Sequence, residues 1–180
     1  MHPPRINAGR IFNLTIMLNM NKVEHNFSYQ EYESVDAMPQ DDSELVRAAR
    51  KVTSNAYAPY SNFLVGAVAK LNNGETVSGT NQENASYPVT ICAERVLLSV
   101  ASTIYPDAVI QTIAVSYNNL KGSSSKPISP CGMCRQSLSE YEARFGSPIR
   151  LLLSGQSGKV YVIESASHLL PLSFGSKDME

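Results

Sequence analysis

Apolar and polar positions alternate along most of the chain with the periods of helices and strands. Stretches in which apolar residues recur every three or four positions predict helices, and short apolar runs bounded by turn residues predict buried strands. The two kinds of element alternate, which is typical of one sheet covered by helices. In chain order the predicted elements are a helix over residues 42–56, strands over 63–71 and 75–80, a helix over 92–103, a strand over 109–117, a helix over 131–145, strands over 149–153 and 159–163, and a short helix over 165–170.

Local residue types predict where these elements begin, turn and pair. Asp42 and Ser43 have side chains suited to cap the first helix, and Asn72-Asn73-Gly74 suits the tight turn of a hairpin. The last two strands are joined by the five residues 154–158, which are too few for a parallel crossover. The sequence therefore predicts an α/β fold with a five-stranded mixed sheet in which the last two strands are antiparallel.

Residues 1–40 carry a weaker pattern than the rest of the chain. The apolar stretch 11–18 is interrupted by polar residues, so we expect a leader tail rather than a signal peptide. Residues 21–32 alternate loosely and predict a strand or an extended arm. We therefore expect an N-terminal extension over 1–40, made of a tail and an arm, followed by a single domain over 41–180.

Charge and hydropathy exclude some classes of partner. The chain has 15 Lys and Arg against 16 Asp and Glu, a formal net charge of −1, and no basic tract, whereas nucleic-acid binders carry a positive excess. The chain contains no run of about 20 apolar residues, so no membrane span is predicted. We therefore expect a small-molecule substrate, with neither nucleic acid nor a membrane as partner.

Three cysteines stand in two short motifs, Cys92-Ala93-Glu94 and Cys131-Gly132-Met133-Cys134. An odd number that includes a Cys-x-x-Cys pair argues against a disulfide framework and suits reduced thiols in the cytoplasm. Thiolates in this spacing are preferred zinc ligands, and neither motif has a neighbouring histidine to close the site. Three protein ligands leave one position for water, which is typical of catalytic zinc. We therefore expect one Zn²⁺ per chain, held by Cys92, Cys131 and Cys134.

Charged residues beside these cysteines are candidates for catalysis. Glu94 lies two residues after Cys92, and if it faces the metal its carboxylate can act as general acid and base. Both cysteine motifs open predicted helices, whose positive ends favour thiolates. Arg95 and Arg135 are adjacent donors that can offset the negative charge of three thiolates through hydrogen bonds around the metal.

Each motif alone allows other interpretations. A Cys-x-x-Cys pair also occurs in redox dithiols and in structural zinc sites. A closed, non-enzymatic zinc module needs a fourth ligand, for which His25 or His168 would have to be brought in by folding. A deaminase that acts on polynucleotides shares the zinc signature, but the near-neutral charge and the short link between the last two strands argue against that enzyme.

With these motifs the chain resembles the cytidine deaminase family in its small, three-cysteine, homotetrameric form. The resemblance covers about residues 42–175, whereas residues 1–40 and the loop 118–129 depart from the family pattern. The segments that carry it are Tyr57-Ala58-Pro59-Tyr60-Ser61, Phe63 to Ala67, Asn81 to Tyr87, Ile91 to Arg95, Pro130 to Gln136, and Leu169-Leu170-Pro171 with Phe174.

The resemblance implies a fold, an activity and an assembly. The fold is a three-layer α/β/α sandwich. The activity is hydrolytic deamination of free cytidine and deoxycytidine to uridine and deoxyuridine, as part of pyrimidine salvage, by a zinc-activated water with a glutamate proton shuttle. The assembly is a homotetramer with shared active sites. Family members that deaminate nucleoside antibiotics share the cysteine motifs, but the loop from Asn81 to Tyr87 favours an ordinary nucleoside.

The resemblance also implies roles for individual residues. Judged without it, Phe63 is a core residue, Asn81 and Glu83 are solvated turn residues, and Phe174 anchors a tail. The implied roles are zinc binding for Cys92, Cys131 and Cys134, proton transfer for Glu94, support of the metal site for Arg95, contact with the ribose 3′-hydroxyl for Asn81 and Glu83, packing against the nucleoside for Phe63, a backbone N–H toward the base for Ala93, and stacking on the pyrimidine of a neighbouring subunit for Phe174.

Overall fold

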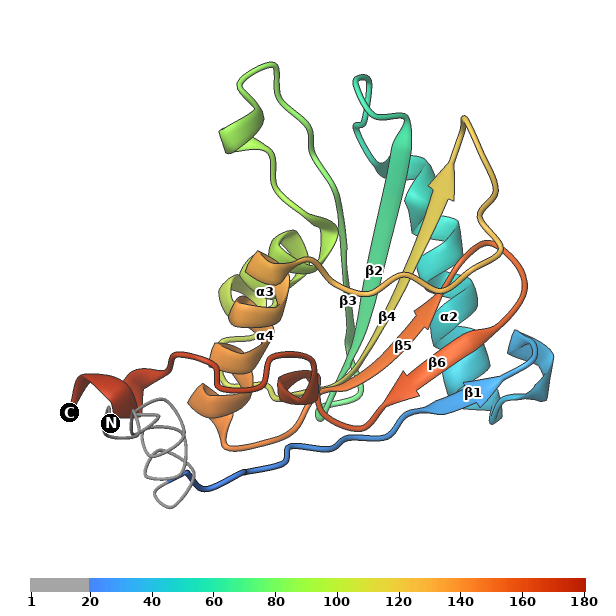
Figure 1. Ribbon diagram of the computed structural model, residues 1–180. Coiled ribbons are helices and arrows are strands. Elements are labelled where there is room, and N and C mark those ends of the chain that lie inside the picture. Colours follow the sequence, from blue (N-terminus) through green and yellow to red (C-terminus); the bar gives the residue numbers. More distant parts are fainter. Residues whose placement is uncertain (1–19) are drawn as a thin grey trace, which may run out of the picture.

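The computed structural model describes residues 20–180, so the tail predicted over residues 1–20 lies outside the described residues except for its last position. Helices cover both faces of a single sheet (Figure 1). Within this part of the chain, no helix has both the length and the apolar character needed to span a bilayer. The elements are β1 (Gln30–Tyr32), α2 (Gln40–Val52), β2 (Phe63–Leu71), β3 (Thr76–Thr80), α3 (Ala93–Ile104), β4 (Ile110–Asn119), α4 (Gly132–Phe145), β5 (Arg150–Ser154), β6 (Val160–Ile163) and the short 3₁₀ helix η4 (Ala166–Leu169).

The strands follow the order β1-β6-β5-β4-β2-β3. β4 and β5 are parallel and are connected through α4, while the other neighbouring strands are antiparallel. The prediction that the last two strands are antiparallel is confirmed, with Leu152 of β5 opposite Val162 of β6. The predicted three-layer sandwich is also confirmed, with α2 on one face and α3 and α4 on the other (Figure 1).

The prediction of five strands is wrong by one, because the arm before residue 33 adds a sixth. Gln30 pairs with Val162 and Tyr32 with Val160, which places β1 at the edge of the sheet beside β6. The strand has only three residues, and its partner lies more than a hundred positions away, so local alternation is too short to distinguish a strand from an extended arm. Val35 and Met38, which follow it, are buried in the core beneath α2.

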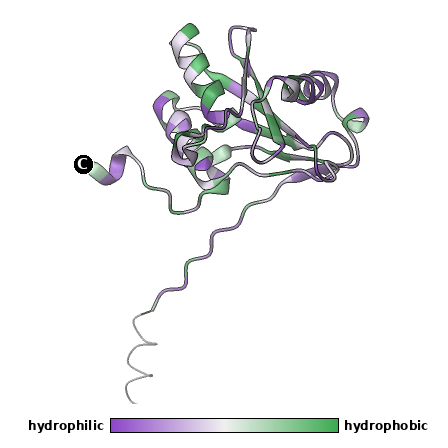
Figure 2. Cartoon of the chain, turned by 90° about the horizontal axis from the view of Figure 1, so that it is seen from above, coloured by the Kyte–Doolittle hydropathy of each residue, from purple (hydrophilic) through white to green (hydrophobic). Residues whose placement is uncertain are grey.

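Side chains of the central strands point alternately to the two faces of the sheet, and so they contribute to two separate hydrophobic cores. In β4, Ile113 and Val115 face α3 and α4, whereas Ala114 between them faces α2. β5 repeats the pattern, with Leu151 and Leu153 toward α3 and α4. Figure 2 shows hydrophobic residues along the strands and on parts of the helices that cover them. Burial on both faces explains why the central strands appear in the sequence as continuous apolar runs.

Two glycines in the sheet let helices approach closely. A Cβ added to Gly66 would lie 2.6 Å from the carbonyl oxygen of Ala49 in α2. A Cβ added to Gly79 would lie 2.4 Å from the carbonyl oxygen of Ala93 in α3. Both distances are below any normal contact, so α2 and α3 rest directly on backbone that carries no side chain.

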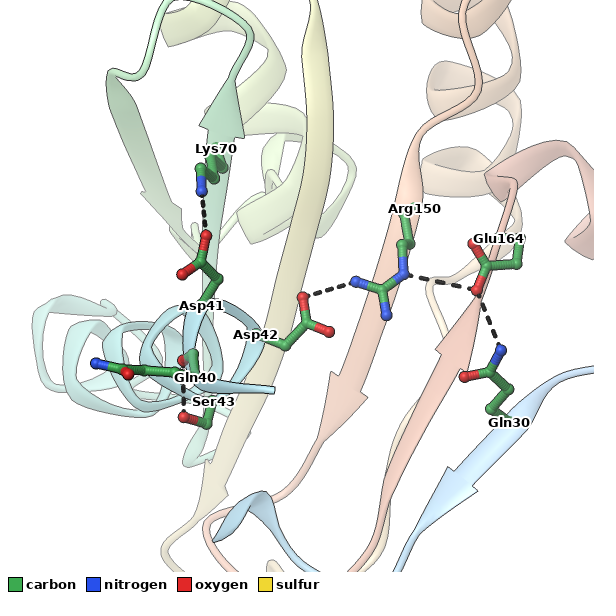
Figure 3. A network of polar contacts seen from close by, with 8 residues as sticks. All are labelled: Gln30, Gln40, Asp41, Asp42, Ser43, Lys70, Arg150 and Glu164. Atoms are coloured by element: carbon green, nitrogen blue, oxygen red, sulfur yellow. Dashed lines mark hydrogen bonds and ion pairs between the residues drawn. The ribbon is translucent and has the colours of Figure 1, made fainter. Parts of the chain in front are cut away.

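The N-terminus of α2 is held by ion pairs and not by the predicted caps. The helix begins at Gln40 after Pro39, so Asp42 and Ser43 lie within its first turn, and the prediction that they cap the helix is wrong. Asp42 instead accepts a 2.6 Å hydrogen bond from Nη1 of Arg150 in β5. The same guanidinium lies 3.6 Å from Glu164, which accepts a hydrogen bond from Gln30 (Figure 3). This network joins α2, β5, the end of β6 and β1.

Candidate active site

Three cysteine thiols meet where α3 and α4 begin. Cys92 is the residue before α3, Cys131 is the residue before α4, and Cys134 lies in the first turn of α4. The Sγ–Sγ distances are 3.8 Å between Cys92 and Cys131 and 3.5 Å between Cys131 and Cys134. Tetrahedral zinc with Zn–S bonds of about 2.3 Å places two thiolates about 3.8 Å apart. The cluster therefore fits a zinc ion without rearrangement of the helices.

The cluster contains three ligands and not four. Among residues 20–180, these cysteines form the one group of at least three His, Cys, Asp or Glu side chains whose ligand atoms lie close enough to share an ion. His25 and His168, which a closed zinc module would need, are not part of it. Cys134 is buried and Cys131 is exposed, so the group opens to solvent on one side. Three soft ligands with an open side are the donor set of a catalytic zinc.

The neighbouring thiols shift the pKa of Cys92 and of Cys134 in opposite directions. The hydrogen bond from Cys134 is the largest influence that lowers the pKa of Cys92, which falls to about 6 although burial opposes the shift. The same hydrogen bond raises the pKa of Cys134, the donor. The charge of Arg95 also lowers the pKa of Cys92. Cys92 therefore ionises readily, as a metal ligand must.

Glu94 is a buried carboxylate in the first turn of α3. Its exposed fraction is 5%, and burial raises its pKa above the ordinary value. Hydrogen bonds from its own backbone N–H and from the side chain of Cys134 lower this pKa. The bond from Cys134 places the carboxylate beside the thiol cluster. A carboxylate near the open side of such a cluster can take up and release protons there.

The two arginines beside the cysteines have different surroundings. Arg135 donates from Nε to the carbonyl oxygen of Pro130 at 2.8 Å and from Nη1 to that of Leu169 at 3.0 Å. Two of the guanidinium N–H groups of Arg135 are thus taken by backbone carbonyls, one directly before Cys131 and one in η4, and its support of the metal site stays a prediction. Arg95 acts on Cys92 through its charge.

Asn81 and Glu83 hold the backbone around the start of β2. Asn81 accepts a 2.7 Å hydrogen bond from the N–H of Val65 at Oδ1 and donates from Nδ2 to the carbonyl of Phe63 at 2.9 Å. Glu83 accepts hydrogen bonds at Oε2 from the N–H groups of Tyr60 at 2.9 Å and Ser61 at 3.2 Å. Burial works to raise the pKa of Glu83, but its hydrogen bonds from Ser61 and Tyr60 keep it below the ordinary value. An amide and a carboxylate retain further donor and acceptor positions for a ligand.

The remaining predicted residues lie at the borders of the thiol cluster or apart from it. Ala93 is the first residue of α3 and is fully buried, and its N–H belongs to the donors that a helix leaves unpaired at its N-terminus. Phe63 is partly exposed at the start of β2. Phe174 is 61% exposed, and its carbonyl accepts a 2.9 Å hydrogen bond from Gln136 of α4. The structure therefore does not bring the ring of Phe174 into the cluster of its own chain.

Sequence reasoning missed Tyr117. This residue of β4 is 5% exposed, and its ring stacks on that of Phe63 with centroids 4.7 Å apart and planes inclined by 14°. Its place depends on the pairing of β2 with β4, which sets Val65 opposite Tyr117. The alternation of the strand beginning at residue 109 indicates which face Tyr117 occupies but not which residue of β2 it meets.

The chain is similar to known proteins both in sequence and in fold. Residues 39–145 match the family model described as the cytidine and deoxycytidylate deaminase zinc-binding region. A cytidine deaminase of Halalkalibacterium halodurans is 34% identical over 135 residues, which are 75% of this chain and 95% of that protein. The crystal structure of a cytidine deaminase from Burkholderia pseudomallei, 38% identical, superimposes with a TM-score of 0.65 over 76% of this chain and 100% of that one. A blasticidin-S deaminase of Bacillus cereus is 30% identical over 137 residues, 75% of this chain and 93% of that protein.

Proposed function

The chain belongs to the cytidine and deoxycytidylate deaminase family, and from that premise we propose that this hydrolytic deaminase converts free cytidine and deoxycytidine to uridine and deoxyuridine, with release of ammonia. The observation that carries the proposal is the three-thiol cluster at the start of two helices, with the buried carboxylate of Glu94 beside it. Reduced thiols are required for such a site, which agrees with a role in pyrimidine salvage in the cytoplasm.

Cys92, Cys131 and Cys134 would hold the zinc ion. When bound, zinc supplies a water molecule of lowered pKa at the position that the three thiolates leave open. α3 begins directly after Cys92, and α4 begins directly after Cys131. The partial positive charge at the start of each helix stabilises the negative charge of the ligands. Arg95 offsets part of the same charge, as its effect on the pKa of Cys92 indicates.

Glu94 would carry the protons of the reaction. It accepts a proton from the attacking water and delivers it to N3 of the cytosine ring, which makes C4 more electrophilic. After the oxygen has added to C4, Glu94 transfers the remaining hydroxyl proton to the amino group, and the C4–N bond breaks to release ammonia. Water and cytidine thus become uridine and ammonia with no other reactant. Burial suits this role, because it raises the pKa of the carboxylate above the ordinary value and so makes it a better proton acceptor.

The nucleoside would lie between the thiol cluster and the start of β2. Asn81 and Glu83 would bind the ribose 3′-hydroxyl with the hydrogen-bonding positions left after they have fixed the backbone of β2. Phe63 would pack against the nucleoside, and the N–H of Ala93 would meet the base. Ala93 lies in the core between the sheet and α3, and Phe63 is on the same face of β2 as Val65, which packs against that core.

We propose a homotetramer in which Phe174 stacks on the pyrimidine of a neighbouring subunit. The segment after Leu170 leaves the body of the domain (Figure 2), with Leu172 fully exposed and Phe174 largely exposed. Large apolar side chains are also exposed in the segments before β2 and before α3, which favours burial against another copy of the chain. They are Tyr57, Tyr60, Tyr87 and Val89.

The test of this function is a comparison of substrates on one zinc-loaded preparation. Cytidine, deoxycytidine, deoxycytidylate, blasticidin S and a short cytosine-containing oligonucleotide are each incubated with the protein, and the products are separated by chromatography. We expect conversion of cytidine and deoxycytidine only. Faster conversion of the oligonucleotide would contradict the proposal in favour of a polynucleotide enzyme, and faster conversion of blasticidin S would assign the site to antibiotic deamination.

A further inference from the structure

The ring of Tyr117 lies directly behind Phe63 at the edge of the site. The two rings are nearly parallel, 14° apart in plane and 4.7 Å apart in centroid. Val65 is opposite Tyr117 in the pairing of β2 with β4, so Phe63, two positions earlier, is the diagonal neighbour of Tyr117 on the same face of the sheet. Aromatic pairs in this stacked geometry attract one another beyond the area they bury.

The main chain of Phe63 is fixed on both sides of the residue. Its N–H donates to Oγ of Ser61 at 3.0 Å, and its carbonyl accepts from Nδ2 of Asn81 at 2.9 Å. Asn62 before it adopts a left-handed conformation with φ of 59°, which asparagine tolerates better than most residues. The principal freedom left to Phe63 is the rotation of its ring, and Tyr117 restricts that rotation.

The stack has one covered side and one open side. Tyr117 is 5% exposed and shields one face of Phe63, whereas Phe63 itself is partly exposed. The start of α3 rests on Gly79, which pairs with Ala67 of β2. Val65, on the same face of β2 as Phe63, packs against the core beneath α3, and α3 begins directly after Cys92 and carries Glu94 in its first turn. The stack therefore lies on the face of the sheet that also carries the thiol cluster.

We infer that Tyr117 is a positioning residue for the substrate, whose ring backs Phe63 and fixes the surface on which the pyrimidine nucleoside rests. The inference rests on the proposed function, in which Phe63 packs against the nucleoside. It assigns to Tyr117 an effect on substrate binding and none on the chemical step, because Tyr117 touches neither the thiols nor Glu94 among the contacts of the described residues.

The test compares kinetic constants for cytidine in Tyr117→Leu and Tyr117→Phe. Leucine keeps the apolar volume and removes the ring, and we expect it to raise KM by about 3- to 10-fold, the range that a stacked aromatic pair supports, with kcat within twofold of the unchanged enzyme. Phenylalanine keeps the ring and should restore KM to within twofold. Tyr117→Met serves the same purpose as leucine if that variant does not fold.

Tyr141→Leu is the matched control. Tyr141 is a tyrosine of the same burial, 6% exposed, whose ring lies 4.9 Å from that of Phe145 in α4, away from the cluster. A general loosening of the core would change KM in both variants, whereas the inference predicts a change in Tyr117→Leu alone. If Tyr117 acts through Phe63, the KM of the double variant Phe63→Leu/Tyr117→Leu should equal that of Phe63→Leu and not the product of the two effects.

Three results would overturn the inference. They are a KM for Tyr117→Leu within twofold of the unchanged enzyme, an equal rise in Tyr141→Leu, and multiplicative effects in the double variant. Absence of cytidine turnover by the unchanged, zinc-loaded protein would overturn the proposed function and this inference together. Normal turnover with an unaltered KM in Tyr117→Leu would overturn this inference alone.

Discussion

At the scale of single residues, the site combines groups whose contacts are local with groups whose contacts come from distant segments. Cys131 and Cys134 lie within one turn at the start of α4, and Cys92 and Glu94 lie within one turn at the start of α3, so short spacings in the sequence indicated both motifs, and the structure brings the three thiols together. Arg135 and Tyr117 depend on partners far along the chain, Leu169 in one case and Phe63 in the other. No local pattern contains that information, which is why the backbone partners of Arg135 were not predicted and Tyr117 was missed.

Glu94→Gln tests the proton carrier. The amide keeps the size of the side chain but cannot accept and return a proton, so we expect kcat for cytidine to fall by at least about 100-fold with zinc still bound at one per chain. Steady-state kinetics and metal analysis of the same sample measure both quantities. Glu140→Gln, an exposed position of α4, is the control and should keep full activity. Turnover in Glu94→Gln within tenfold of the unchanged enzyme would remove Glu94 from this role.

At the scale of elements, the site depends on where α3 and α4 are held. α3 rests on Gly79 of β3, and the C-terminal part of α4 is held by the buried carboxylate of Glu142. That carboxylate accepts hydrogen bonds from the N–H groups of Ile149 at 2.6 Å, Ala166 at 2.8 Å and Ser167 at 3.1 Å. The first contact fixes the start of α3, next to Cys92, and the second fixes α4 at the end away from its thiols.

Gly79→Ala is expected to displace α3. The added methyl group would lie 2.4 Å from the carbonyl oxygen of Ala93 and 2.5 Å from the amide nitrogen of Leu97, and neither helix backbone atom can move alone. We expect a loss of about 1–3 kcal/mol in the free energy of unfolding, as for other overpacked sites, and weaker zinc binding. Denaturant unfolding and a competition titration with a metal chelator measure these effects. Ser78→Ala on the exposed face of the same strand should change neither, and an equally stable Gly79→Ala protein would contradict the account of this contact.

Glu142→Gln is expected to loosen α4 from β5 and η4. One oxygen acceptor becomes an NH₂ donor that faces backbone N–H groups, so at least one buried hydrogen bond is lost and a donor is left without a partner. The expected cost is about 2–3 kcal/mol in the free energy of unfolding. Glu140→Gln on the same helix again provides the comparison, since that side chain is exposed. Equal unfolding midpoints for the two variants would show that the Glu142 contacts contribute little.

At the scale of the whole molecule, the sandwich places its polar chemistry on one side of the sheet. α3 and α4 bring the thiols together on that side, while α2 covers the opposite face and is held by Arg150 (Figure 3). The order of elements and the antiparallel last pair could be predicted, because apolar runs and short links are local features. The sixth strand could not, because a three-residue edge strand is defined by its pairing partner and not by its own pattern.

Self-association is a prediction at this scale. If the proposed homotetramer forms, sedimentation equilibrium should give four times the mass of the chain at micromolar concentration, with the exposed apolar side chains before β2 and α3 buried between copies. Tyr87→Asp should shift the distribution toward smaller species and reduce turnover with them, since a charge at an apolar interface is costly. Val23→Asp, an exposed apolar position in the arm, is the control. A monomer with full activity would contradict the shared active site.

The measurement that tests the central claim most directly is turnover of cytidine as a function of bound zinc. Protein stripped with a chelator is titrated with zinc, and the loss of cytidine absorbance and the release of ammonia are followed at each ratio. We predict that activity rises in proportion to zinc and reaches its maximum at one ion per chain, with ammonia equal to the cytidine consumed. A protein that binds one zinc per chain and leaves cytidine unchanged, or that retains its activity after zinc has been removed, would contradict the assignment of this cluster as the catalytic centre of a cytidine deaminase.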